Sequence, residues 1–121
     1  MWEPVVLLPG MMCDARLFAP QIDMLSSLCA VSVPDLTQYD SMSRLAASVL
    51  ADAPQDFALA GLSMGGIVAM EIMRQAPERV TRLALLDTNP LAEADVMKAK
   101  RAPQIAKAKA CLLYTSDAAD E

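Results

Sequence analysis

FALAGLSMGGIVAMEIMRQ, residues 57–75, joins a short apolar run to a glycine-rich turn and then to a segment that is apolar nearly all round. The first four residues predict a buried strand, and the segment from about Met64 to Gln75 predicts a helix that Pro77 ends. A helix with apolar side chains on every face is typical of one that packs under a sheet. The stretch therefore predicts a strand that passes directly into a buried helix.

The same pairing of strand and helix recurs along the chain. Val5 to Leu8 is a continuous apolar run, as a buried parallel strand would be, and Ser41 is a predicted N-cap for a helix that Pro54 stops. Strands are predicted at 5–8, 30–33, 57–60 and 82–86, with helical patterns following at about 18–29, 42–50, 64–75 and 91–110. Such alternation predicts an α/β fold with a parallel sheet covered by helices on both faces.

Composition and charge exclude several classes of protein. The 121 residues carry a formal net charge of −5, which argues against a nucleic-acid-binding surface, and their hydrophobic content of 55% argues against disorder. The sequence has no run of some 18 apolar residues, so no membrane span is predicted. It also has no basic segment near Met1, so no signal peptide is predicted. Cys13, Cys29 and Cys111 are widely spaced, so we expect reduced thiols and a cytoplasmic protein. The absence of histidine excludes His-containing metal sites, and no metal or cofactor is expected.

The composition changes after residue 90. Residues 1–90 are expected to form one core, and residues 91–110 to form a helical segment that is broken near Pro103. Residues 111–121 then carry three acidic residues and no basic one, and they resemble the in-frame translation of a sequencing adapter. We expect this tail to be non-native and leave it out of the fold.

The turn between the strand and the helix of the quoted stretch carries the chemistry. Gly61, Ser63 and Gly65 fit the pattern G-x-S-x-G of the nucleophile elbow, in which a serine occupies a strained turn between a strand and a helix. The two glycines lack side chains and so let strand and helix approach closely. The free N–H groups at the start of the helix favour a developing oxyanion. The turn at residues 9–11 ends the first strand, and it can place a second N–H at the same sheet edge.

These segments resemble those of the α/β-hydrolase-fold serine esterases, and they are most similar to pimeloyl-carrier-protein methyl ester esterases and related small carboxylesterases. The matching segments cover essentially residues 4–90 in family order, namely 5–11, 34–36, 60–66, 77–80 and 83–87. The resemblance implies that residues 1–90 are the N-terminal half of an α/β-hydrolase core and that residues 91–110 begin the lid. One departure is that Pro9-Gly10 stands where most relatives have His-Gly.

The resemblance also implies an activity and its residues. Ser63 is expected to be the nucleophile, with the backbone N–H groups of Met64 and Met11 forming the oxyanion hole. The implied reaction is the hydrolysis of a small-molecule or carrier-bound carboxylic ester through an acyl-enzyme, without a cofactor.

Each of these residues also has a structural interpretation. Ser63 could be an N-cap serine, and Met11, Met12 and Met64 could either line an apolar acyl pocket or fill gaps in the core. Asp87 could be a triad acid relocated to the fourth strand, but a turn residue is favoured there, and Asp35 is likewise interpreted as a turn residue.

Two other functions are compatible with parts of the pattern. A non-catalytic ligand receptor would keep the fold and its pocket without turnover. A dinucleotide-binding Rossmann domain would use Gly61 and Gly66 as the outer glycines of G-x-G-x-x-G and Asp87 to hold a ribose. Against this, Ser63 replaces the central glycine, and the pattern does not follow the first strand.

A Ser–His–acid mechanism in this fold needs an acid and then a histidine after the serine. The chain has no histidine, so we expect the sequence to be truncated before its acid and histidine and to be inactive as given. On the same hypothesis, the strand at 82–86 should form a bare sheet edge.

Overall fold

A computed structural model describes residues 2–89 and 103 of the chain. The chain divides into two units, Met1–Pro90 and Leu91–Glu121. Apart from Pro103, the predicted lid segment and the predicted non-native tail lie outside the described residues. Both assignments therefore stay predictions, and the account below concerns the first unit.

The first unit is built on a parallel sheet, as the sequence predicts. The strands are β1 (Val5–Leu8), β2 (Val31–Ser32), β3 (Phe57–Leu62) and β4 (Val80–Leu86), and their order in the sheet is β2-β1-β3-β4. Two strands are longer than the apolar patterns predict. The reason is that β3 and β4 pair from Phe57 and Val80 to Leu62 and Leu86, which extends β4 at its start and adds the glycine-containing end of β3 to the ladder.

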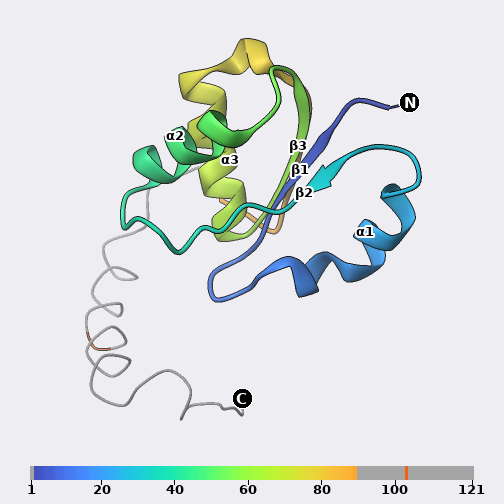
Figure 1. Ribbon diagram of the computed structural model, residues 1–121. Helices are drawn as coiled ribbons and strands as arrows, with labels where there is room; N and C mark the ends of the chain where they lie inside the picture. Colours follow the sequence, from blue (N-terminus) through green and yellow to red (C-terminus); the bar gives the residue numbers. More distant parts are fainter. Residues whose placement is uncertain (1, 90–102, 104–121) are drawn as a thin grey trace. The chain divides into compact units, whose positions relative to one another are not determined.

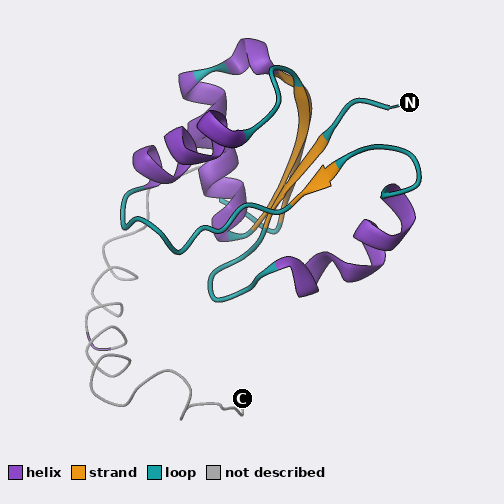
Figure 2. Ribbon diagram, in the orientation of Figure 1, coloured by secondary structure: helices purple, strands orange, loops and turns teal. Residues whose placement is uncertain are grey.

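Helices cover both faces of this sheet, which confirms the predicted α/β architecture (Figures 1 and 2). The 3-10 helix η1 (Ala15–Phe18) and α1 (Ala19–Leu25) lie on one side, and α2 (Met42–Asp52) and α3 (Met64–Gln75) pack together on the other. A short 3-10 helix, η2 (Pro77–Arg79), leads into β4. Because β2 and β3 flank β1 on opposite sides, the connections run in opposite directions and place α1 and α2 on opposite faces.

The helix ends follow local chemistry. The Ser41 hydroxyl accepts a hydrogen bond from the Arg44 N–H at 3.3 Å, which confirms the predicted N-cap of α2. The predicted helix at 18–29 is shorter in the structure, since α1 ends at Leu25. Beyond that point, the Ser26 hydroxyl donates to the Ile22 carbonyl, a side-chain bond that competes with continuation of the helix.

The core lies between the sheet and the pair α2 and α3. It contains the buried side chains of Val6, Leu8, Leu36, Leu45, Ala46, Val49, Phe57, Leu59, Val68, Ala69 and Ile72. Alternate residues of β3 belong to it, which gives this strand one face toward α3 and one face toward the side of α1. The buried face of β3 leads directly into α3, so the position of the following turn is fixed by the core.

Arg79 joins the end of α2 to the entrance of β4. Its guanidinium donates to the carbonyl oxygens of Leu50, Ala53, Pro54 and Gln55 over distances of 2.7 to 3.1 Å. The last carbonyls of a helix have no intrahelical donor, and a cation near them also favours the helix dipole. This arrangement gives a structural role to residues 77–80, one of the segments on which the resemblance in the sequence rests.

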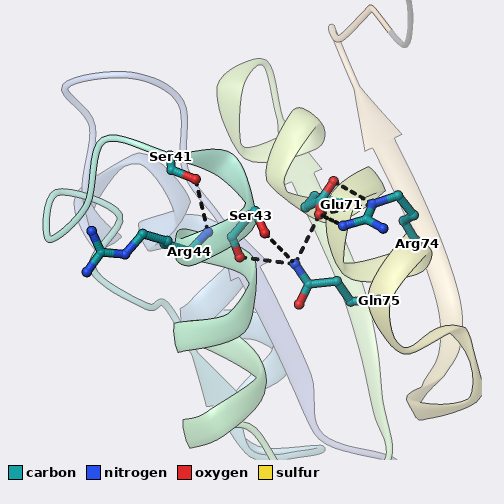
Figure 3. A network of polar contacts seen from close by, with 6 residues as sticks. All are labelled: Ser41, Ser43, Arg44, Glu71, Arg74 and Gln75. Atoms are coloured by element: carbon teal, nitrogen blue, oxygen red, sulfur yellow. Dashed lines mark hydrogen bonds and ion pairs between the residues drawn. The ribbon is translucent and has the colours of Figure 1, made fainter.

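A polar network links α2 to α3 on their exposed side (Figure 3). The Gln75 amide donates to the Ser43 carbonyl at 3.0 Å and to Glu71 Oε2 at 3.0 Å, and Arg74 donates to both Glu71 oxygens. The bonds from Arg74, and then the one from Gln75, lower the pKa of Glu71 to about 2 from its ordinary value of 4.5. The carboxylate therefore stays charged well into the acid range.

We expect Glu71 to make the stability of the fold depend on acid pH. A carboxylate whose folded-state pKa is depressed stabilises the fold above its unfolded-state pKa and loses that contribution as the pH falls toward the folded-state value. Urea unfolding should therefore show a stability difference between the native chain and Glu71→Gln that is full above about pH 5 and shrinks toward pH 2. Glu78→Gln, at an exposed position on η2, is the matched control for loss of one carboxylate. An equal difference at about pH 6 and pH 3 would contradict the assignment.

Candidate active site

The strand order places two turns side by side at one edge of the sheet. The chain leaves β1 toward β2 on one side, and β3 lies on the other side of β1, so the direction of winding changes between β1 and β3. Ligands of open α/β sheets bind at such a switch point, outside the carboxyl ends of the strands. The ends of β1 and β3 carry the turn at residues 9–11 and the turn at Ser63. The order also differs from the 3-2-1-4 order of a Rossmann domain, which counts against the dinucleotide-binding alternative.

Ser63 has a strained backbone and an exposed position between β3 and α3. Its φ of 55° and ψ of −114° lie outside the regions that L-residues favour, and its side chain makes no capping hydrogen bond to α3. An N-cap serine instead has extended backbone and accepts a bond from the first turn, as Ser41 does. Ser63 therefore occupies the N-cap position of α3 without capping the helix through its side chain, which is the part of the N-cap interpretation that the structure contradicts.

Steric contacts explain why glycines flank this serine. A Cβ atom at Gly61 would overlap the backbone of the first turn of α3 and would lie 2.7 Å from the nitrogen of Gly66. A Cβ atom at Gly65 would overlap the carbonyl of Leu8 at the end of β1. The first glycine thus lets α3 turn back on its own strand, and the second lets α3 lie against the neighbouring strand. Both contacts fit the close approach expected from the G-x-S-x-G pattern.

Both backbone polar groups of Ser63 are bonded. Its N–H donates to the Leu86 carbonyl at 2.9 Å, and its carbonyl accepts from the Gly66 N–H at 2.9 Å and from the Thr88 hydroxyl at 2.8 Å. Thr88 is a residue that the sequence analysis did not find. A single threonine after a strand has no periodicity and belongs to no short motif, so only its place directly after the fourth strand could have indicated it.

The turn after β1 lies directly against the Ser63 turn. A Cβ atom at Gly10 would lie 3.7 Å from the Cβ of Ser63, and the Cys13 N–H closes the turn onto the Gly10 carbonyl at 3.1 Å. Met12, within this turn, has a φ of 62°. The residue that follows Ser63, Met64, is the first residue of α3, where backbone N–H groups have no acceptor inside the helix. The turn after β1 and the first turn of α3 therefore meet at Ser63.

The methionines of the two turns have different environments. Met11 and Met12 are 59% and 69% exposed, so the interpretation that they fill core gaps is wrong for both. Met64 is half-buried and packs against the core cluster, which fits that interpretation for this one residue. The physical reason is position, because the first two lie in a loop beyond the sheet and the third lies on the face of a buried helix. The exposed pair therefore presents apolar side chains on the turn whose Gly10 lies against Ser63.

The aspartates near the strand ends have conformational roles. Asp87 is exposed, has a φ of 51°, and directly follows β4, a backbone conformation that aspartate tolerates better than most residues. Asp35 accepts from the backbone N–H of Thr37 at 2.9 Å and from its hydroxyl at 2.6 Å, which confirms the predicted turn. The side-chain bond and then the backbone bond from Thr37 lower the pKa of Asp35.

Residues 2–89 and 103 hold no group of His, Cys, Asp and Glu side chains that could bind a metal ion. In the same residues, every helix is too short or too polar to cross a bilayer.

Comparison with known proteins finds esterases that are similar to this chain. No protein-family model matches the chain. Pimeloyl-[acyl-carrier protein] methyl ester esterases from Vibrio parahaemolyticus and Pectobacterium carotovorum are 32% and 35% identical to it over 94 residues, or 71% of this chain. The chain spans 37% of the length of these curated relatives.

Solved structures give the same result for the fold. An esterase from Thermogutta terrifontis is 25% identical and superposes with a TM-score of 0.80, covering 90% of this chain and 45% of its own. The naproxen esterase of Bacillus subtilis, at 23% identity, has a TM-score of 0.68 over 85% of this chain and 41% of its own. The architecture is therefore that of α/β-hydrolase esterases, and this chain covers less than half of each of these two structures.

Proposed function

We infer that this chain, which has the α/β-hydrolase fold and is similar to pimeloyl-[acyl-carrier protein] methyl ester esterases, carries the nucleophile of a serine hydrolase that cleaves carboxylic esters. One observation above all supports this inference. Ser63 is held at an exposed turn in a strained conformation, at the head of α3, with its side chain not used to cap the helix. Backbone strain of this kind gathers at active sites, where the surrounding structure maintains it.

The proposed reaction forms an acyl-enzyme on Ser63. The Ser63 Oγ attacks the carbonyl carbon of the ester while a base takes its proton, and the carbonyl electron pair moves onto the oxygen. The N–H groups of Met64 and Met11 stabilise that oxyanion. The electron pair then returns, the C–O bond breaks, and the alcohol leaves with a proton. Water attacks the acyl group by the same steps and regenerates the serine.

The base in this scheme does not come from the chain itself. The sequence contains no histidine, and loss of the base from a catalytic triad lowers kcat by about 10⁶-fold. We therefore propose that the 121 residues supply the nucleophile and the oxyanion donors without completing a triad. Asp87 is not assigned as the acid, because its exposed, left-handed position fits a turn.

The substrate class that we propose is a small-molecule or carrier-bound carboxylic ester. The similar curated proteins are named for a methyl ester borne by an acyl-carrier protein. Met11 and Met12 present flexible apolar side chains to solvent on the turn whose Gly10 lies against Ser63, and methionine adapts to irregular apolar ligands. Such a surface suits the acyl chain of an ester more than a charged ligand.

The test replaces the serine with a nucleophile that needs no general base. In Ser63→Cys the thiolate can attack p-nitrophenyl acetate directly, through an oxyanion intermediate, whereas its alkylation by iodoacetamide forms no oxyanion. Peptide mapping measures both rates at the introduced thiol. We expect the ratio of acylation to alkylation to be at least about 10-fold higher than for Ser27→Cys, an exposed control position after α1.

The native chain, treated in the same way, should form no acyl adduct at Ser63 within the same time. A ratio at Ser63→Cys equal to that at Ser27→Cys would overturn the oxyanion hole and would favour a non-catalytic ligand receptor on the same fold. Rapid acylation of the native serine would overturn the proposal that no base is present.

A further inference from the structure

Thr88 is held in a fixed place between the Ser63 turn and the first turn of α3. Its hydroxyl donates to the Ser63 carbonyl at 2.8 Å, from a half-buried position 25 residues along the chain. Its side chain also lies directly against Gly66, where a Cβ atom would come within 2.6 Å of both the Cβ and the Oγ1 of Thr88. The absence of a side chain at Gly66 therefore makes room for this threonine.

The residues around Thr88 hold Ser63 from the same side. Leu86 accepts the Ser63 N–H at 2.9 Å, and Asp87 turns the backbone with a φ of 51°. The segment 86–88 thus bonds both the N–H and the carbonyl of the strained serine. A residue in a rare backbone conformation persists only when its surroundings fix it in this way.

Fixing the Ser63 carbonyl has an effect on the next residue. The peptide group is planar, with its carbonyl and its N–H on opposite sides, so the direction of the Ser63 carbonyl sets the direction of the Met64 N–H. A hydrogen bond to the carbonyl oxygen also polarises the peptide and strengthens its N–H as a donor. The Thr88 hydroxyl therefore acts at one end of the peptide whose other end is the oxyanion donor.

We propose that Thr88 is a positioning residue that orients and polarises the Ser63–Met64 peptide, so that the Met64 N–H stabilises the oxyanion. This role rests on the proposed function, since it concerns the same oxyanion hole. It differs from a purely structural role, because the hydroxyl is required at this position and packing alone does not replace it.

The test uses the Ser63→Cys chain, in which acylation passes through an oxyanion and alkylation does not. Thr88→Val has nearly the shape of threonine without the donor, and Thr88→Ser keeps the donor without the methyl group. We expect Thr88→Val to lower the ratio of acylation to alkylation by roughly 5- to 10-fold, less than the loss of a whole oxyanion donor. Thr88→Ser should keep the ratio within about twofold, and the alkylation rate should stay within about twofold in both.

The outcomes separate this inference from the proposed function. If Ser63→Cys shows the raised ratio and Thr88→Val leaves it unchanged, the role of Thr88 is overturned while the oxyanion hole stands. If Ser63→Cys shows no raised ratio over Ser27→Cys, the proposed function itself fails. Should Thr88→Val not fold by circular dichroism, Thr88→Ser still decides the question, because a fall of its ratio below one fifth would overturn a role for the hydroxyl.

Discussion

Gly65→Ala is expected to remove most of the stability of the fold. The added Cβ would overlap the carbonyl oxygen of Leu8 and would lie 2.6 Å from the carbonyl carbon of that residue and 2.7 Å from the carbonyl oxygen of Pro9. These are backbone atoms at the end of β1, a buried inner strand of the sheet, and of the residue that follows it, so they cannot rotate away as a side chain would. We expect a loss of about 3 to 5 kcal/mol in the free energy of unfolding, at the upper end of overpacking effects.

Urea unfolding followed by circular dichroism measures this loss. Gly10→Ala is the matched control, since it adds the same methyl group where the closest atoms would lie 3.7 Å away, at an ordinary van der Waals distance. Its stability should stay within about 0.5 kcal/mol of the native chain. Equal stability of Gly65→Ala and the native chain would show that α3 does not lie against β1 as described.

The native chain is expected to self-associate through β4. Among the described residues no strand pairs with the outer side of β4, and Leu83, Leu85 and Leu86 are 42%, 40% and 48% exposed. An edge strand with free backbone groups and apolar side chains pairs readily with other chains. Sedimentation at micromolar to millimolar concentration should therefore show species that grow with concentration.

A single charge on this edge should reverse the association. Leu85→Lys places a solvated cation among the leucines, a change that natural edge strands use to prevent pairing. Met24→Lys makes the same kind of change at a 72% exposed residue of α1 and should leave the association unaltered. A native chain that sediments as a monomer over the whole concentration range would contradict the exposed edge and the bare-edge expectation from the sequence.

Regular elements with a strong apolar pattern could be predicted from the sequence. The bounds of α3 and of β1 agree with their patterns, because each is packed against the core over its whole length. The helix at 18–29 was predicted too long, since its apolar spacing continues after Leu25 while the side chain of Ser26 bonds back to the helix. Apolar spacing alone does not report such local side-chain bonds.

The candidate site could be predicted only in part. The G-x-S-x-G pattern predicts Ser63 and its glycines, because the steric requirements of the turn fall on residues that are close together in the sequence. Thr88 and Arg79 act through contacts with residues about 25 positions away, and these contacts arise only when the sheet is assembled. The exposure of Met11 and Met12 likewise depends on where the loop lies, since methionine occurs both in cores and on binding surfaces.

Three residues other than glycine have a positive φ in the described part of the chain, namely Met12, Ser63 and Asp87. They follow β1, β3 and β4, all at the carboxyl edge of the sheet. Each of these conformations costs about 1 kcal/mol or more, and it persists because the surrounding structure holds the residue in place. Substitutions that stabilise the chain by relieving backbone strain would therefore concentrate at this edge. Substitutions selected for thermal stability would therefore change the candidate site first, which is a trade-off between stability and activity.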